Sequence, residues 1–202
     1  QMLQKTRKPL VVMSPKSLLR HPKCISTLED LAAGSFQHII VDDIAPKNIK
    51  NAVFCSGKVY YELLTHREMI DLFQSSSDTK EKEIAATYFK KFGSMGILNR
   101  LKNGETINTS TIAINRIEQL YPFPSDEIKE CLQSFGNPKV TWCQEEPRNM
   151  GAWPMFDEWL CNLLDGEYPE YIGRKTSASP AAGSKKNHTA EQAAIIDKVF
   201  KL

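Results

Sequence analysis

Residues 52–64 read AVFCSGKVYYELL, and this stretch decides the fold class. Residues 52–55 form a short apolar run that predicts a buried strand, and from Val59 onward apolar residues recur at the spacing of a helix. The turn 56–58 (Ser-Gly-Lys) between them makes this a strand-to-helix step, the first half of a βαβ unit. A parallel sheet with crossover helices is therefore expected.

The same alternation continues on both sides of this step. Ser26 with Glu29, and Thr189 with Gln192, have the spacing of capping boxes, and Ser125 is predicted to cap a third helix. Strands that alternate with helices predict an α/β fold, with a mostly parallel sheet of about five strands and helices on both faces. The other predicted strands are 10–13, 37–41, 111–117, 140–143 and 171–172, and the other predicted helices are 27–33, 125–135, 156–164 and 190–202.

Residues 74–108 do not fit the alternation. Residues 74–82 are rich in serine and charge and predict a loop, 83–92 predict a helix, and Gly93 and Gly96 are expected to break it. We therefore expect a mobile insertion at 74–108 that carries one or two short helices.

The composition is that of an ordinary globular protein, with 41% hydrophobic and 25% charged residues. The formal net charge of +2 over 202 residues does not favour a broad nucleic-acid surface. No run of 18 apolar residues predicts a membrane span, and residues 1–9 lack the apolar core of a signal peptide. The start at Gln1 suggests a trimmed chain.

The cysteines and histidines predict no metal site. The five cysteines are odd in number and include no CxxC pair, so buried free thiols in a reducing compartment are expected. The four histidines do not fall at ligand spacing with them.

Two short motifs have both a chemical and a structural interpretation. The turn 56–58 could hold a phosphate at a helix N-terminus, but it lacks the GxxxxGK[ST] spacing, and a tight turn is favoured. Glu145 and Glu146 follow a strand, where paired carboxylates could share a proton or bind a metal. Adjacent residues of an extended chain point to opposite sides, however, so a loop-anchoring or interface role is favoured for both. Trp153 is expected to be a core or interface anchor. No residue is predicted to be catalytic.

Five segments together resemble one family, the thiamine-diphosphate-dependent decarboxylating component of 2-oxoglutarate dehydrogenase. Each is similar to a motif of that family, and the five occur in the family's order across nearly the whole chain. They are RKPLVVMSPKSLLRH (7–21), CSGKVYY (55–61), RIEQLYPFP (116–124), WCQEEP with NMGAW (142–147 and 149–153) and GRKTSASPAAG (173–183).

The resemblance implies a domain arrangement. Residues 1–20 look like the final strand and linker of an upstream pyrimidine-binding domain, with Lys16 and Arg20 as interface or loop-anchoring candidates. Residues 21–202 look like the transketolase-like C-terminal domain, whose features begin near residue 35. The implied role of this domain is structural, in dimerisation and in regulation.

The resemblance also implies the activity of the whole enzyme. The family oxidatively decarboxylates 2-oxoglutarate and transfers succinyl to a lipoyl group in the tricarboxylic acid cycle. Thiamine diphosphate and Mg²⁺ bind between upstream domains, so this chain alone is expected to bind neither cofactor and to be inactive. The implied partners are a second copy of the enzyme and the lipoyl-bearing succinyltransferase, without nucleic acid or membrane. A bacterial cytoplasmic location is favoured over a mitochondrial matrix one.

Some family members have an acetyl-CoA pocket in this domain. Gln119 falls on a pocket position by resemblance, but Asp126 and Glu127 replace the two arginines that hold phosphates there. Because two anions repel a polyphosphate, acetyl-CoA control is expected to be absent.

Three alternatives remain open at this point. The chain could be the same domain of a 2-oxoadipate dehydrogenase. It could also be a freestanding α/β module that binds a ligand at the turn 56–58, or a protein–protein scaffold without a ligand. A gene that begins near Gln1 would favour the last two.

Overall fold

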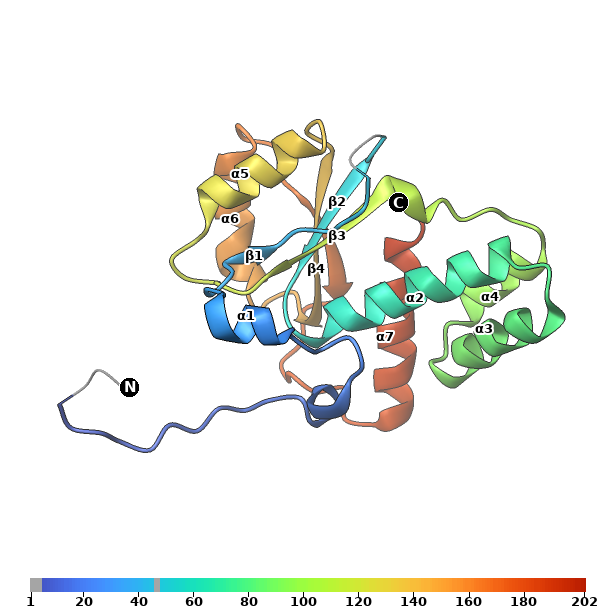
Figure 1. Cartoon of the computed structure of the whole chain (residues 1–202), viewed down its shortest axis with the longest axis horizontal. Helices are drawn as coiled ribbons and strands as arrows, with labels where there is room; N and C mark the ends of the chain where they lie inside the picture. Colours follow the sequence, from blue (N-terminus) through green and yellow to red (C-terminus); the bar gives the residue numbers. More distant parts are fainter. Residues whose placement is uncertain (1–4, 46–47) are drawn as a thin grey trace. The chain divides into compact units, whose positions relative to one another are not determined.

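A computed structural model describes residues 5–45 and 48–202 of the chain (Figure 1). The chain divides into two compact units, Gln1–Ser35 and Phe36–Leu202. This division falls later in the chain than the predicted boundary at residue 20.

The first unit contains a 3₁₀ helix η1 (Lys16–Arg20) and a helix α1 (Leu28–Ala33). Helix α1 confirms the prediction, but its capping box is Thr27 with Asp30 rather than Ser26 with Glu29. Thr27 Oγ1 accepts from the backbone amide of Asp30 at 3.1 Å, and Asp30 Oδ2 accepts from that of Thr27 at 2.9 Å. Both residue pairs have the three-residue spacing of a capping box. Which pair forms the cap depends on the residue at which the helix begins.

Residues 10–13 are not the buried strand that their composition predicted. Leu10, Val11, Val12 and Met13 are 69%, 80%, 70% and 91% exposed and belong to no strand. A strand needs a neighbour for its backbone hydrogen bonds, and none of the residues that the structure describes pairs with this segment. A hydrophobic run alone therefore does not make a strand here.

The second unit is built on a five-stranded sheet with the order β1-β3-β2-β4-β5. Strands β2 to β5 are parallel to their neighbours, and only β1 is antiparallel, which confirms the mostly parallel sheet. The predicted strand at 37–41 is reduced to two residues. The bounds are β1 Ile39–Ile40, β2 Asn51–Cys55, β3 Ile112–Ile117, β4 Lys139–Pro147 and β5 Glu170–Arg174.

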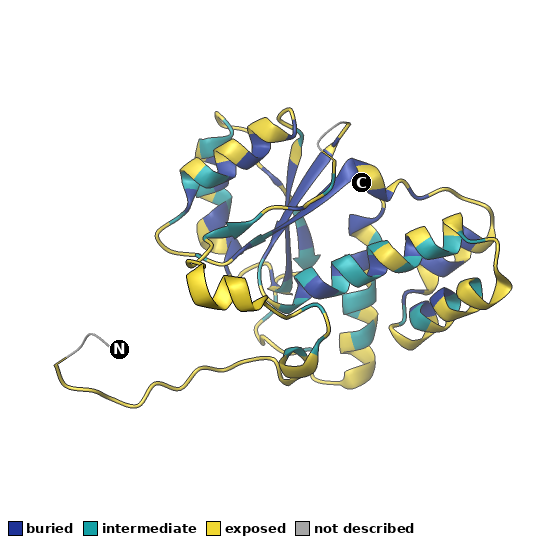
Figure 2. Cartoon of the chain, in the orientation of Figure 1, coloured by how far each residue is buried: buried dark blue, intermediate teal, exposed yellow. Residues whose placement is uncertain are grey.

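Helices cover both faces of the sheet, as predicted (Figure 1). On one face lie α2 (Lys58–Ser75), α3 (Thr79–Lys91), α4 (Met95–Lys102) and α7 (Lys185–Val199), and on the other lie α5 (Ser125–Ser134) and α6 (Trp153–Leu163). Val53 and Cys55 of β2 face the first group, whereas Ala52 and Phe54 face the second. Every residue of this central strand is buried, as Figure 2 shows. No helix in the described part of the chain could span a membrane.

Residues 74–108 carry two helices, as predicted, and both pack into the core. Helix α2 runs through to Ser75, α3 begins at Thr79, and a short 3₁₀ turn η2 (Thr109–Thr111) precedes β3. Phe89 and Leu98 are fully buried in the core beneath α2. Gly96 was expected to break a helix but lies inside α4, where a Cβ would come within 2.7 Å of Asp197 Oδ1. The glycine therefore allows α4 to approach α7 closely.

Two predicted helix caps are wrong. Ser125 is the first residue of α5 and makes no capping bond. Helix α7 begins at Lys185, because Ser184 Oγ accepts from the backbone amide of Asn187 at 3.1 Å. Thr189, the predicted cap, lies within the helix and donates its hydroxyl to Lys185 O.

A buried carboxylate attaches the chain after β1 to the sheet. Asp42 is 7% exposed, accepts from the backbone amide of Ile114 in β3 at 2.6 Å, and forms an ion pair with Arg67 of α2. Its Oδ1 lies 3.0 Å from Nη2 of that arginine, and its own backbone amide donates to Asn115 Oδ1. A single side chain thus joins β3 and α2 to the segment after β1.

Candidate functional site at the carboxyl edge of the sheet

The parallel strands end where the helices that follow them leave in opposite directions. β2 leads into α2 on one face, whereas its neighbours β3 and β4 lead into α5 and α6 on the other face. Open α/β sheets place binding sites at such a switch of direction. Cys55 at the end of β2 lies between Arg116 of β3 and Cys143 of β4. This edge brings together segments that are far apart in the sequence.

Lys58, the first residue of α2, connects three elements at this edge. Its Nζ lies 2.8 Å from Oε1 of Glu145 in β4 and also pairs with Glu62 one turn along α2. Glu62 in turn accepts from Nε2 of Gln192 in α7 at 2.7 Å. Since Lys58 is already paired with two carboxylates, the tight-turn interpretation of residues 56–58 is favoured over phosphate binding.

Burial acts in opposite directions on the pKa values of this pair. For Lys58 burial lowers the pKa, but the hydrogen bonds and charges of Glu145 and Glu62 together outweigh burial and raise it. For Glu145 burial raises the pKa, and Lys58 only partly opposes this effect. Lys58 is therefore protonated at neutral pH and is not a general base. The pair connects β4 to α2.

The two adjacent glutamates have different surroundings. Glu145 is bound to Lys58, whereas Glu146 is exposed and pairs with no cation among residues 5–45 and 48–202. They were predicted to follow the strand, but β4 extends to Pro147, which pairs with Arg174 of β5. Glu145 thus has the geometry of a loop-anchoring residue, and Glu146 remains an interface candidate.

Gln144 organises the turn that follows β4. It is 3% exposed, and its Oε1 accepts from Trp142 Nε1 at 2.9 Å and from the backbone amide of Trp153 at 3.1 Å. Its Nε2 donates to Met150 O at 2.7 Å and Pro147 O at 3.1 Å. A polar residue two positions after a buried tryptophan was a signal for this role that sequence reasoning did not use.

The turn at Gly151 is held close to Gln144. Gly151 has a φ of 69°, and a Cβ there would lie 3.0 Å from Gln144 Oε1. Glycine is therefore required both for the backbone conformation and for the close approach. Trp153, 3% exposed, is covered by the guanidinium of Arg148 at 5.3 Å. Its role within this chain is that of a core and loop-anchoring residue.

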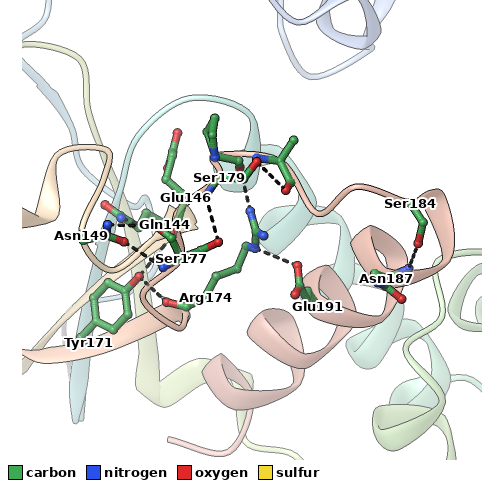
Figure 3. A network of polar contacts seen from close by, with 12 residues as sticks. Gln144, Glu146, Asn149, Tyr171, Arg174, Ser177, Ser179, Ser184, Asn187 and Glu191 are labelled. Atoms are coloured by element: carbon green, nitrogen blue, oxygen red, sulfur yellow. Dashed lines mark hydrogen bonds and ion pairs between the residues drawn. The ribbon is translucent and has the colours of Figure 1, made fainter.

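A second polar network fixes the loop between β5 and α7 (Figure 3). Asn149 and Ser177 form a reciprocal pair, with Nδ2 donating to Ser177 O at 3.0 Å and Oδ1 accepting from its amide at 3.1 Å. Arg174 donates to Pro180 O at 2.8 Å and pairs with Glu191 of α7 at 2.7 Å. These contacts join two of the segments that carry the family resemblance.

Arg116 holds the end of β3 against the start of α2. Its guanidinium lies 4.7 Å from the ring centre of Tyr60 and 5.0 Å from that of Tyr61, and it bonds the Tyr61 hydroxyl. Its Nε lies 2.8 Å from Glu118 Oε1. Segments 55–61 and 116–124 therefore meet here as well.

Gln119 lies between β3 and α5, and its side chain bonds within that segment. Its Nε2 donates to Pro122 O at 2.9 Å. Nearby, Glu127 in the first turn of α5 accepts from His38 Nδ1 at 2.6 Å, and this hydrogen bond lowers the pKa of the Glu127 carboxyl. Glu127, paired with the His38 imidazole, thus keeps a carboxylate at one of the two positions where the sequence predicts no phosphate-binding arginine.

Lys16 and Arg20 lie at the two ends of η1 in the first unit, and both are exposed. Four of the five cysteines are buried and Cys24 is exposed, and all are free thiols. In the described part of the chain, no three His, Cys, Asp or Glu side chains are grouped so that they could hold a metal ion.

The fold and this edge define an α/β domain whose polar residues join structural elements. Residues 25–78 and 97–200 match the family described as 2-oxoglutarate dehydrogenase C-terminal. The chain belongs to this family.

Relatives of known name support the same assignment. The chain is 38% identical to the 2-oxoglutarate dehydrogenase E1 component of Azotobacter vinelandii over 99% of its own length, and 37% identical to that of Haemophilus influenzae over 98%. It is 36% identical to the mitochondrial 2-oxoglutarate dehydrogenase of Caenorhabditis elegans over 96%. It spans only 18%, 18% and 16% of these three relatives.

Proposed function

We propose that this chain is the C-terminal domain of a 2-oxoglutarate dehydrogenase E1 component, in which it supports dimerisation and assembly rather than bond-making. The observation that carries the proposal is the convergence of four resemblance segments on one sheet edge. The Lys58–Glu145 pair joins segments 55–61 and 142–147, and Asn149 with Ser177 joins segments 149–153 and 173–183. Arg116 joins segment 116–124 to segment 55–61. Lys58, Gln144, Asn149 and Arg174 at this edge each connect different segments of the fold.

We propose that the chemistry of the whole enzyme belongs to a cofactor that upstream domains bind. Thiamine diphosphate supplies the electron sink for decarboxylation when it is bound with Mg²⁺. Mg²⁺ takes oxygen ligands from carboxylates, phosphates and water, and the absence of a group of three His, Cys, Asp or Glu side chains in the described ranges supports a site outside this chain. We therefore assign no catalytic step to a residue of this chain.

The domain proposal includes the two irregular parts of the chain. Residues 1–20 serve as the last strand and linker of an upstream domain, which would supply the neighbour that Leu10 and Val12 lack. Residues 74–108 contain the insertion, whose centre is 79–96, the stretch between the two matched ranges. Lys16, Arg20 and Glu146 are interface candidates for the second copy or for the lipoyl-bearing succinyltransferase.

Expression of the full-length gene product tests the proposal. The purified protein is expected to decarboxylate 2-oxoglutarate, faster than 2-oxoadipate, only with thiamine diphosphate and Mg²⁺, and to transfer succinyl to a lipoyl domain. The 202-residue chain assayed alongside is expected to be inactive. Turnover by the chain alone, or none by the full-length protein with both cofactors, contradicts the proposal.

We further propose that acetyl-CoA does not regulate this enzyme. Asp126 and Glu127 place two carboxylates in the first turn of α5, where a polyphosphate would be repelled. Calorimetry on the full-length protein is expected to detect no binding of acetyl-CoA, and D126R/E127R is expected to gain it. Binding to the unaltered protein contradicts this proposal. The proposed location is the bacterial cytoplasm, which cell fractionation tests.

A further inference from the structure

Strand β5 ends the sheet in the described part of the chain, so one of its edges has no partner strand. The chain continues past Arg174 through residues 175–177 without joining another strand. A cavity of about 390 Å³ lies between residues 173–177 and one face of α7. The α7 residues that line it are Glu191, Ala194, Ile195 and Lys198, whose spacing places them on the same face of the helix. A free strand edge beside a helix is the geometry in which extended peptides add to a sheet.

The charges along this groove favour an acidic occupant. Arg174 is neutralised by Glu191 at 2.7 Å. Lys175 and Lys198 line the same groove, are exposed, and have no ion-pair partner within residues 5–45 and 48–202. Ala194 between them is small and exposed, so it leaves room for a peptide backbone.

We propose that the groove between β5 and α7 binds an extended acidic peptide segment, which adds to the sheet as a strand beside β5. Pairing of β5 with the same strand of a second copy is disfavoured, because a two-fold axis at this edge would bring identical lysines together. Edge lysines also protect sheets from association, and the experiment separates this role from binding.

The test uses the whole chain and two fluorescein-labelled decapeptides, one of alternating Thr and Glu and one of alternating Thr and Lys. Fluorescence anisotropy is expected to show saturable binding of the Thr-Glu peptide, weakening as salt is added, and no binding of the Thr-Lys peptide. Hydrogen exchange is expected to slow at the amides of residues 173–177 when the Thr-Glu peptide is bound.

Two variants and a matched control complete the test. K175E/K198E is expected to weaken binding about tenfold or more, and Ala194→Trp, which fills the groove, by a similar factor. Lys186→Glu, which reverses an exposed charge on the same helix outside the groove, is expected to change the affinity less than about twofold. Circular dichroism checks that each variant is folded, and both groove substitutions lie at exposed positions.

Three results overturn the proposal. They are the absence of saturable binding of the Thr-Glu peptide, an equal loss of affinity in Lys186→Glu, and protection of amides elsewhere with none at 173–177. Dimers of the unaltered chain that dissociate in Ala194→Trp would show instead that the edge pairs with a second copy.

Discussion

Similar apolar residues are buried in one unit of the chain and exposed in the other. In Phe36–Leu202, Phe54, Ile114 and Trp142 are fully buried, whereas in Gln1–Ser35 Leu10 and Met13 are 69% and 91% exposed. The second unit buries its strands because parallel neighbours and helices cover them on both faces. Residues 5–35, the described part of the first unit, form no sheet. Whether an apolar segment is buried therefore depends on the elements that pack against it. The first unit is expected to be stabilised by contacts with parts of the enzyme outside this chain.

The largest expected effect lies in the second unit. Asp42→Ala leaves the Arg67 guanidinium and the Ile114 amide without their acceptor in a buried place, and is expected to lower the free energy of unfolding by about 3–5 kcal/mol. Urea unfolding followed by circular dichroism measures it. Asp43→Ala, at the exposed neighbouring position, is the control, with an expected change below about 0.5 kcal/mol. Equal losses of unfolding free energy in Asp42→Ala and Asp43→Ala would contradict the role assigned to the Asp42 carboxylate.

The next effect concerns the turn after β4. Gln144→Ala removes the acceptor of both Trp142 Nε1 and the Trp153 amide, and is expected to cost about 2–4 kcal/mol of unfolding free energy. Gln133→Ala, at an exposed position of α5, is expected to be nearly neutral. If hydrogen exchange of residues 147–153 stays unchanged in Gln144→Ala, the turn does not depend on this side chain.

A pH-dependent effect of intermediate size is expected from His66, which is 2% exposed. Its Nδ1 lies 2.8 Å from Glu62 O, which only accepts, so the neutral ring donates there and accepts from Ser94 Oγ at Nε2. Burial lowers the pKa of His66, despite the opposing hydrogen bond to the Glu62 carbonyl and the Glu62 charge, and the Tyr88 hydroxyl also faces the ring.

The sign of this effect follows from proton binding. As pH falls below about 6.5, the unfolded histidine binds a proton and the folded one does not, so stability falls by up to about 1.4 kcal/mol per pH unit until the folded pKa is reached. His66→Gln is expected to flatten the profile between pH 7 and 5, whereas His188→Gln, at an exposed position, leaves it unchanged. If the stability–pH profiles of His66→Gln and His188→Gln have the same shape, His66 is not the source of the pH dependence.

The smallest effect on this chain is expected in the first unit. Val12→Lys should change the unfolding free energy of the 202-residue chain by less than about 0.5 kcal/mol, because Val12 is already 70% exposed. In the full-length protein the same change is expected to cost about 1.5–3 kcal/mol, if an upstream sheet buries the residue. Thermal scans of both forms measure the difference. Neutral behaviour in both would show that residues 10–13 have no partner in the enzyme.

The sequence predicted the elements of the second unit better than their ends. The apolar run 52–55 and the helical spacing after Val59 were sufficient, because a central strand and its helix carry strong patterns. Thr189 failed as a cap because a hydroxyl that fits a cap also fits an intrahelical bond to Lys185 O. Gly96 failed as a helix breaker because its function is the approach to Asp197, a contact between distant segments that no local pattern reveals.

The site was predicted in part for the same reason. Glu145 was expected to follow the strand and to anchor a loop, but it lies within β4 and its pair with Lys58 connects β4 to α2. Trp153 was expected to be a core or interface anchor, and its side chain is buried. The role of Gln144 and the pairing of Asn149 with Ser177 depend on which turns meet at the sheet edge. These contacts between distant turns are determined by how the helices pack on the sheet, and not by the residues nearby in sequence.

Helices α4 and α7 approach closely at Gly96, and α7 forms one side of the groove beside β5. Gly96 meets Asp197 of α7, and the residues of α7 that line the groove lie on another flank of the helix. A side chain at residue 96 would place a Cβ only 2.7 Å from Asp197 Oδ1, so the Asp197 carboxylate would have to move from its ion pair with Lys201. Glycine at this exposed position therefore leaves the carboxylate free to hold Lys201 one turn further along the chain.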